Sequence, residues 1–152
     1  MISITGIPGS GKSSVCSYLR NSGYDCRNIL EIDEARDCLE NDEMDIDCLR
    51  DRIKWEGKPC IIIEGHYSHL LPCEMVFILE RDEAETGKTL LQRGYSKEKV
   101  EENLDALRSD IIYQEALELL PSSRIHRIKV VEGNSELAAL KIVDHLRLSK
   151  KD

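Results

Sequence analysis

The sequence predicts an α/β fold of three layers, in which a parallel sheet of about five strands lies between two layers of helices. Two observations predict this fold class. Apolar runs of strand length alternate along the chain with amphipathic stretches of helical spacing, an order typical of parallel sheets covered on both faces. The chain has 152 residues, of which 41% are hydrophobic and 33% charged. It therefore suits one packed domain over residues 1–152.

The strands are predicted from short apolar runs. Residues 1–5 are expected to form the first strand, and one near 25–29 is only weakly indicated by the pattern. Apolar residues then recur at 59–63 and 75–79. Residues 124–131 alternate between apolar and polar side chains, which indicates a strand with one less buried face or a place at the edge of the sheet.

The helices are predicted from apolar residues at helical spacing. Residues 13–19 and 135–148 are expected to form the first and the last helix. Between residues 97 and 120, four apolar side chains recur at spacings of four, three and four, which predicts one face of a single long helix. These side chains are Val100, Leu104, Leu107 and Ile111.

The charge of the chain limits the partners that it can bind. The net charge is −8 and the isoelectric point is about 5.1, which disfavours direct binding to nucleic acid because such binding needs a basic surface. No segment approaches the roughly 20 apolar residues of a membrane helix, and the N-terminus does not resemble a signal peptide. We therefore expect a cytoplasmic protein without membrane contact.

The six cysteines lie ten to thirteen residues apart, at positions 16, 26, 38, 48, 60 and 73. No CxxC pair is present, which argues against a zinc knuckle or a dithiol redox site. For a cytoplasmic chain we expect these cysteines to be reduced and mostly buried thiols.

Residues 6–13 read GIPGSGKS and match the phosphate-binding loop G-x-x-x-x-G-K-[ST] between a strand and a helix. In this P-loop, glycines let backbone N–H groups point inward and form a nest for phosphate, next to a helix N-terminus. Lys12 would reach the β- and γ-phosphates, Ser13 would give its hydroxyl to Mg²⁺, and Ser14 would contact the α-phosphate. The predicted binding residues for Mg-ATP are Gly9, Ser10, Gly11, Lys12, Ser13 and Ser14.

Residues 60–66 read CIIIEGH, an apolar strand with an acid at its carboxyl end. Ligands bind beyond this end of the strands in doubly wound sheets. Glu64 is therefore a candidate acid of the Walker B type, which would hold Mg²⁺ or orient a nucleophile, although a solvated acid at a strand end is the alternative. His66 would contact phosphate or position water, or else serve as an ordinary loop histidine. The remaining histidines, at 69, 126 and 145, are interpreted as structural.

Residues 93–96 read RGYS, which predicts the end of one helix and the N-cap of the next. Phosphoryl transfer depends on positive charge placed around the moving group. An arginine on a mobile hairpin can supply that charge, so Arg93 is a candidate lid arginine, with an ordinary surface residue as the equal alternative.

Residues 31–56 hold eleven acidic and four basic residues, with Ile46, Leu49 and Ile53 at helical spacing. A solvated helical face is the simpler interpretation of this acidic stretch. The alternative is a surface that accepts a basic protein partner.

The segments GIPGSGKSS, IIIEGH and QRGYSKEKVEEN together resemble the archaeal-type adenylate kinases, in the same order and over most of the chain. The eukaryotic member of that family is the nuclear adenylate kinase isoenzyme six, also described as a ribosome-assembly ATPase. The resemblance implies a P-loop kinase fold with a nucleoside-monophosphate segment at about 28–53 and a short lid at about 92–102. It also implies a lid-side ATP contact from Arg93.

The activity implied by the resemblance is transfer of the γ-phosphoryl group of Mg-ATP to AMP, with ATP hydrolysis as a second activity. In that reaction, Lys12 and Arg93 would stabilise charge, while Glu64 and His66 would order the metal-bound water or the acceptor. One alternative is a ribosome-assembly ATPase that acts on a basic small-subunit ribosomal protein. Another is a kinase for a different small acceptor, such as a nucleoside or a shikimate-like alcohol.

Three positions depart from the family pattern. Glu64 stands where the family usually has aspartate. Thr89 stands where many members carry an arginine, four residues before the RGY motif, and either Lys88 or Arg108 could replace that cation. The usual arginine after the strand at 75–79 appears one residue later, as Arg81.

Overall fold

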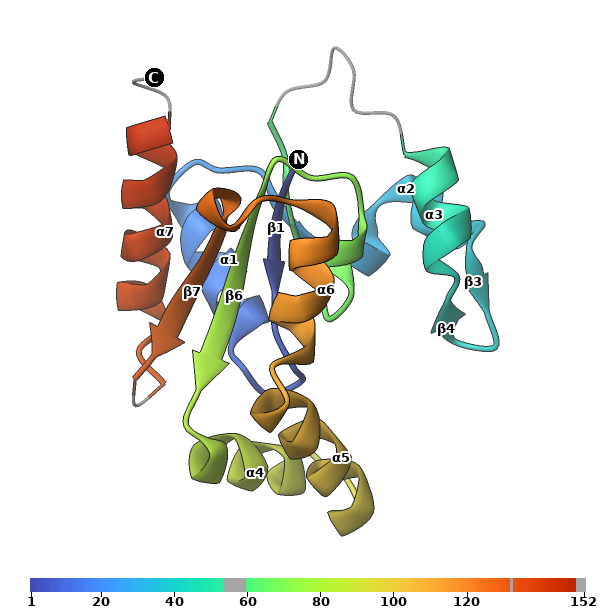
Figure 1. Ribbon diagram of the computed structural model, residues 1–152, viewed down its shortest axis with the longest axis vertical. Helices are drawn as coiled ribbons and strands as arrows, with labels where there is room; N and C mark the ends of the chain where they lie inside the picture. The colour runs from blue at the N-terminus through green and yellow to red at the C-terminus, as the bar shows by residue number, and fades with distance from the viewer. Residues whose placement is uncertain (54–59, 132, 150–152) are drawn as a thin grey trace.

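The computed structural model describes residues 1–53, 60–131 and 133–149. A five-stranded sheet forms its centre, with the strand order β2-β5-β1-β6-β7 and parallel pairing throughout (Figure 1). The predicted fold class and strand number are therefore confirmed. The strands are β1 (Ile2–Thr5), β2 (Cys26–Asn28), β5 (Ile62–Glu64), β6 (Met75–Arg81) and β7 (Ile125–Val130).

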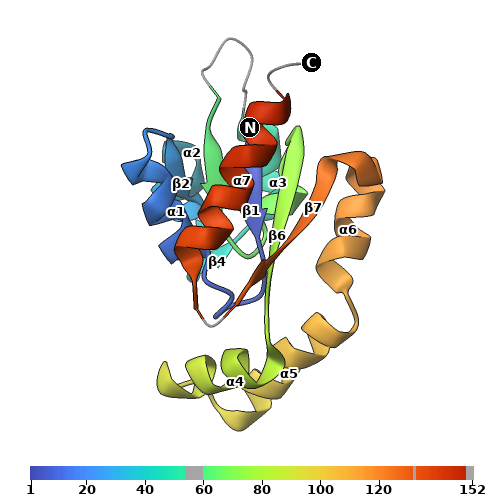
Figure 2. The same cartoon turned by 90° about the vertical axis from the view of Figure 1, so that its left-hand side faces the viewer.

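Helices cover both faces of this sheet. Successive residues of a strand point to opposite faces, so Phe77 of β6 packs beneath α1 (Lys12–Asn21) and α7 (Ser135–Ser149). Its neighbour Ile78 packs on the opposite face beneath α6 (Ile111–Leu119). Figure 2 shows α7 in front of the sheet and α6 at the right of the view, beyond β7. Within the described residues, no helix has the length and apolar character needed to cross a membrane.

The segment between β2 and β5 forms an arm beside the sheet, at the right of Figure 1. Ala35 and Leu49 are fully buried and belong to a core cluster that joins this arm to the sheet, because it also includes Ile63 of β5. The arm contains the predicted nucleoside-monophosphate segment. Its elements are η1 (Ile29–Glu31), α2 (Asp33–Arg36), the antiparallel strands β3 (Leu39–Glu40) and β4 (Glu43–Met44), and α3 (Ile46–Arg52).

The strand predicted at 59–63 lies further along the chain, at Ile62–Glu64. Residue 59 lies outside the described residues. Glu64 extends the strand because it pairs with Ile4 of β1 and with Asn28 of β2 in the parallel ladder. The acid is thus part of the sheet, and not a cap that follows it.

The prediction of one long helix within residues 97–120 is wrong. Two helices occupy this stretch, α5 (Lys97–Arg108) and α6, and the chain turns between them at Asp110, whose φ is 60°. Aspartate tolerates this left-handed conformation better than most residues. Both carboxylate oxygens of Asp110 accept hydrogen bonds from Arg127 of β7, at 2.8 and 2.6 Å, which holds the turn against the sheet.

The break changes the packing of the predicted apolar stripe. Val100 and Leu104 pack against Leu90 of α4 (Glu83–Gln92) and form a small cluster away from the sheet. On α6 the side chains that reach the sheet are Ile112 and Ala116. Ile111 was expected in the core but is 47% exposed.

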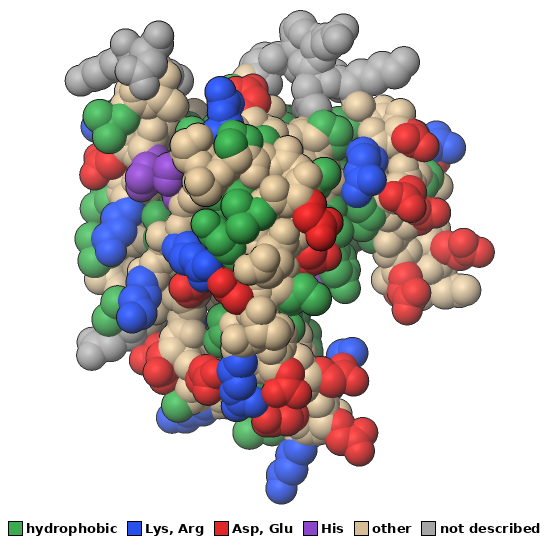
Figure 3. Space-filling view, in the orientation of Figure 1, with side chains coloured by type: hydrophobic (Ala, Val, Ile, Leu, Met, Phe, Trp, Pro, Cys, Tyr) green, Lys and Arg blue, Asp and Glu red, His purple; other side chains and the backbone are tan. Residues whose placement is uncertain are grey.

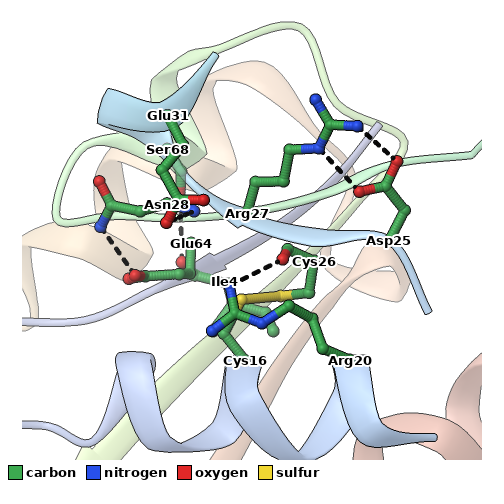
Figure 4. The surroundings of a disulfide bond; sticks show 10 residues. All are labelled: Ile4, Cys16, Arg20, Asp25, Cys26, Arg27, Asn28, Glu31, Glu64 and Ser68. Carbon is green, nitrogen blue, oxygen red and sulfur yellow. Dashed lines mark hydrogen bonds and ion pairs between the residues drawn. A yellow bond between two sulfur atoms is a disulfide. The ribbon is translucent and has the colours of Figure 1, made fainter. Parts of the chain in front are cut away.

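The prediction that the cysteines are reduced is wrong for four of them. The fold brings Cys16 of α1 beside Cys26 of β2, and Cys38 beside Cys48 of α3, with Cα atoms 5.5 and 5.6 Å apart. Both pairs form disulfides, since these distances lie in the usual disulfide range. Figure 4 shows the first of them between α1 and the start of β2. Cys60 and Cys73 remain thiols in the described part of the chain.

The Cys38–Cys48 disulfide is expected to stabilise the arm. Closing a loop of this length restricts the unfolded chain by about 3 kcal/mol in the chain-entropy account. The double variant Cys38→Ser with Cys48→Ser should therefore lose about 3 kcal/mol in the free energy of unfolding, measured in urea. Cys60→Ser is the matched control, because this exposed thiol forms no disulfide. Equal unfolding midpoints for the double variant and the wild type would contradict the prediction.

Candidate active site

The P-loop connects β1 to α1 and turns at glycines. Gly9 and Gly11 have φ angles of 83° and 100°, which side chains rarely adopt. A Cβ on Gly6 would lie 2.9 Å from the carbonyl oxygen of Leu79, so only glycine fits there. Gly11 is the residue before α1, whose first N–H groups thus face the loop and can bind an anion.

Lys12 lies at the start of α1, with its side chain turned back over the loop. Its Nζ atom donates hydrogen bonds to the carbonyl oxygens of Gly6 and Ile7, at 2.9 and 3.0 Å. Burial lowers the pKa of Lys12 to about 8, while Glu64 raises it and Arg93 lowers it. The side chains of Glu64 and Arg93 therefore lie close enough to Lys12 for their charges to change its pKa.

Nucleotide binding is expected to take up protons near pH 8. With a pKa of about 8, about half of the Lys12 side chains are neutral at pH 8 and about a tenth at pH 7. Phosphate charges favour the ammonium form and raise its pKa. Calorimetry of ATP binding in buffers of different ionisation enthalpy should therefore show uptake of about half a proton at pH 8 and much less at pH 7. Lys12→Arg, which stays charged, should show none; equal uptake in this variant would contradict the assignment to Lys12.

Glu64 ends β5 with a buried side chain, only 3% exposed. Its Oε1 atom accepts a hydrogen bond from Nδ2 of Asn28 at 2.7 Å, drawn as a dashed line in Figure 4. The two residues are partners in the parallel register. Asn28 entered the prediction only as the first residue of the arm, because β2 is too short to stand out in the sequence.

The oxygen atoms at this end of the sheet fit a magnesium ion. The Ser13 hydroxyl and the Glu64 carboxylate line the same cleft, and both are the hard oxygen ligands that Mg²⁺ prefers. The described residues contain no group of three or more His, Cys, Asp or Glu side chains that could hold a metal. At a P-loop, Mg²⁺ takes most of its ligands from phosphate and water.

His66 lies beside the P-loop. Its Nδ1 atom is 3.0 Å from the Gly6 carbonyl oxygen, which also accepts from Lys12. Burial lowers the pKa of His66, and the charge of Lys12 lowers it further. The ring is therefore neutral at pH 7, with its proton assigned to Nδ1 because a carbonyl can only accept. Nε2 is therefore unprotonated and accepts a hydrogen bond. It can position a water molecule or a hydroxyl group of a substrate, and it is less suited to bind a negatively charged phosphate.

A buried polar network holds the loop that carries His66. The hydroxyl of Thr5 donates to the carbonyl oxygen of His66 at 3.1 Å and contacts Nδ1 of His69 at 2.9 Å. His69 is buried and its Nε2 atom lies 3.2 Å from Glu115 of α6. Ser68 donates to the carbonyl oxygen of Ile4 at 2.9 Å. His69 thus supports the loop that carries His66 but does not line the cleft.

Arg93 follows α4, and the chain turns at Gly94, whose φ is 88°. Ser96 then caps α5 by accepting a hydrogen bond from the Lys99 N–H group. Both features match the helix stop and the N-cap predicted from the RGYS motif. The predicted lid at 92–102 therefore contains the end of α4, this turn and the first half of α5.

One cleft brings most of the predicted residues together. It has a volume of about 730 Å³ and includes the P-loop, Glu64, His66 and Arg93. Ser10 does not line it: the Ser10 hydroxyl is buried and has no hydrogen-bond partner among the described residues. The far wall comes from the arm and the loop after β5, and consists of Asn28, Ile29, Leu30, Leu39, Asp42, Glu43, Met44, Ile46, Gly65, Tyr67 and Leu70.

Comparison with known proteins identifies relatives of this chain. The family model described as "AAA domain" matches residues 2–110. The chain is 48% identical to a protein of Thermoplasma acidophilum named "Putative adenylate kinase", over 91% of this chain and 93% of that protein. A protein of the same name from Thermoplasma volcanium is 41% identical, over 98% and 95% of the two chains.

Solved structures with low sequence identity share the fold. The YorR protein of Bacillus subtilis, in complex with phosphorylated GDP, is 18% identical with a TM-score of 0.56, over 99% of this chain and 98% of that one. Thymidylate kinase of Candida albicans is 13% identical with a TM-score of 0.54, over 98% and 91%. On the identity and coverage of the Thermoplasma relatives, the chain is a P-loop kinase that belongs to the archaeal-type adenylate kinase family.

Proposed function

We propose that the protein transfers the γ-phosphoryl group of Mg-ATP to AMP and forms two molecules of ADP. One observation supports this most strongly: a single cleft connects the P-loop with the wall formed by the arm. The P-loop suits the triphosphate of a donor, and the arm supplies apolar side chains, among them Leu30, Leu39 and Met44, against which a base can pack. Donor and acceptor would therefore meet over Lys12 and Glu64.

The reaction needs little covalent help from the protein. A phosphate oxygen of AMP attacks the γ-phosphorus, the bond to the β-phosphate breaks, and ADP leaves. Because the attacking oxygen is already ionised, no general base is required, and catalysis rests on positioning and charge. Lys12 and Arg93 stabilise the charge on the moving phosphoryl group, and Nε2 of His66, which accepts a hydrogen bond, orients a water molecule.

Magnesium would supply charge neutralisation on the β- and γ-phosphates. Ser13 would hold it through its hydroxyl. Glu64 would orient its water ligands, with the carboxylate fixed by Asn28 at 2.7 Å.

A panel of acceptors tests this proposal. ADP formation from Mg-ATP would be measured with AMP, CMP, UMP or GMP, and with a nucleoside and a shikimate-like alcohol as further acceptors. The proposal predicts that AMP gives the largest stimulation and that two ADP appear for each AMP consumed. A larger stimulation by another acceptor would replace AMP, and no stimulation by any would argue for an ATPase.

The acidic arm favours a second function, an ATPase that acts on a basic small-subunit ribosomal protein. Acidic side chains crowd the arm in Figure 3, and Asp47 of α3 has an 89% exposed side chain. Residues 54–56, the end of the acidic stretch, lie outside the described residues. A pulldown with such proteins, in the ATP and ADP states, tests this function: selective capture that depends on the nucleotide supports it, and no capture in either state rejects it.

A further inference from the structure

The side chain of Arg81 connects the P-loop to helix α4. Arg81 ends β6, just before α4 begins (Figure 2). Its Nη1 atom donates to the carbonyl oxygen of Gly9 at 3.3 Å and to the hydroxyl of Thr89 at 2.9 Å. Its Nε atom donates to Glu85 at 3.2 Å. One guanidinium group thus contacts the loop and two residues that lie one turn apart on α4.

Gly9 is the point at which α4 lies against the P-loop. A Cβ on Gly9 would be 3.3 Å from Leu90 and 3.6 Å from Thr86, both on α4. A phosphate nest presents N–H groups inward, so the carbonyl groups of the loop must point outward. The bond from Arg81 holds the Gly9 carbonyl toward α4 and therefore fixes the orientation of this peptide unit.

The same contact fixes the end of α4. The N–H group of Arg93 donates to the carbonyl oxygen of Thr89 at 3.1 Å, so Thr89 and Arg93 are joined through the last turn of the helix. Arg93 lines the cleft. A guanidinium that ties Thr89 to Gly9 thereby sets the position of Arg93 relative to the loop.

We propose that Arg81 is a positioning residue of the ATP site. It keeps the P-loop open toward phosphate and keeps Arg93 beside it, so that Lys12 and Arg93 meet the same phosphates. Its guanidinium donates to the Thr89 hydroxyl at 2.9 Å, so Arg81 brings a positive charge to the last turn of α4, beside the P-loop. Arg108 does not serve this purpose, because it is bound to Glu83, Glu101 and Asp105.

The test compares ATP affinity, measured by calorimetry without any acceptor, in wild type and Arg81→Gln. We expect the dissociation constant for ATP to rise about 10- to 100-fold, the loss that corresponds to removal of charge-assisted hydrogen bonds. The side chain is largely buried, at 21% exposed, but its contacts are polar and lie outside the apolar core clusters. The melting temperature should therefore stay within a few degrees, because glutamine keeps an amide donor at this place. Arg108→Gln, which removes three ion pairs away from the loop, is the matched control and should bind ATP like the wild type.

Two further variants separate positioning from general stability. Thr89→Val keeps the shape but loses the hydroxyl, and should weaken ATP binding by about 2- to 10-fold. Adding Thr89→Arg to Arg81→Gln should restore most of the affinity, because an arginine at 89 can bring a guanidinium to the same place. ATP affinity unchanged in Arg81→Gln, or weakened only together with a large fall in melting temperature, would overturn the proposal, as would failure of the added arginine to restore binding.

The effect of Arg81 on the kinase reaction rests on the proposed function, but the two can be tested separately. In the kinase reaction, Arg81→Gln should raise the KM for ATP and lower kcat, with the KM for AMP unchanged within about twofold. If the wild type fails to phosphorylate AMP while Arg81→Gln still loses ATP affinity, the acceptor is wrong and the assignment of Arg81 stands.

Discussion

Replacing Lys12 by alanine is expected to reduce phosphoryl transfer by about 10²- to 10³-fold or more, because it removes a preorganised positive charge from the transferring group. Lys12 lies over the P-loop, and the carbonyl groups of Gly6 and Ile7 fix its ammonium group. Initial rates of ADP formation at saturating Mg-ATP and AMP measure the effect.

The Lys12→Ala variant should lose activity without losing stability. Burial lowers the pKa of Lys12 to about 8, which means that the folded protein disfavours the charged side chain at neutral pH. Its removal should therefore leave the melting temperature equal or higher. Lys129→Ala, on the exposed side of β7, is the control and should keep full activity. If the rate of Lys12→Ala were within tenfold of the wild-type rate, Lys12 would not contact the transferred phosphoryl group and the proposed position of the phosphates would be wrong.

Replacing Glu64 by glutamine is expected to lower kcat by about 10²- to 10³-fold and to raise the Mg²⁺ concentration needed for half-maximal rate. Glutamine has the same shape and can still accept the hydrogen bond from Asn28, so the loss reports the missing charge. Since Glu64 is 3% exposed and ends β5 within the cleft, the substitution should leave the sheet intact.

The variant Glu64→Asp separates the effect of the charge from the effect of side-chain length. It keeps the carboxylate but shortens the side chain by one methylene, so its kcat should fall between those of the wild type and Glu64→Gln. Rates would be measured across a Mg²⁺ titration for all three proteins. If Glu64→Gln had the wild-type rate and the wild-type Mg²⁺ requirement, Glu64 would be a structural acid of the sheet and would not act on the metal.

The sequence was sufficient to predict the sheet and the phosphate end of the site. The strands of a sheet buried on both faces are apolar throughout, as in the runs before Gly6 and before Gly65, and a P-loop has a fixed spacing of glycine, lysine and serine. The turn at Gly94 was likewise predicted, since helix stops and N-caps depend on neighbouring residues.

The features that were missed depend on contacts between distant residues. The helix break at Asp110 is stabilised by Arg127. The spacing of apolar residues does not predict this ion pair. The disulfides require Cys16 and Cys26 to meet through the packing of α1 on β2, which cysteine spacing alone does not reveal. The Asn28–Glu64 bond joins two neighbouring strands that are 36 positions apart in sequence.

The contact of Arg81 with Gly9 was missed for the same reason. In the sequence, Arg81 is one residue away from the place where the resemblance leads one to expect an arginine. A one-residue shift at the end of a strand turns a side chain to the other face. Only the structure shows that this side chain reaches across to the P-loop and to Thr89.

The most direct test of the kinase proposal is the fate of the γ-phosphoryl group. ATP labelled with ³²P at the γ position would be incubated with the protein, Mg²⁺ and AMP, and the products separated. The account predicts that the label appears in ADP, at its β position, and that Lys12→Ala slows this transfer by about 10²- to 10³-fold or more. If the label appears instead as inorganic phosphate at a rate that AMP does not change, the protein hydrolyses ATP and the proposed kinase reaction is wrong.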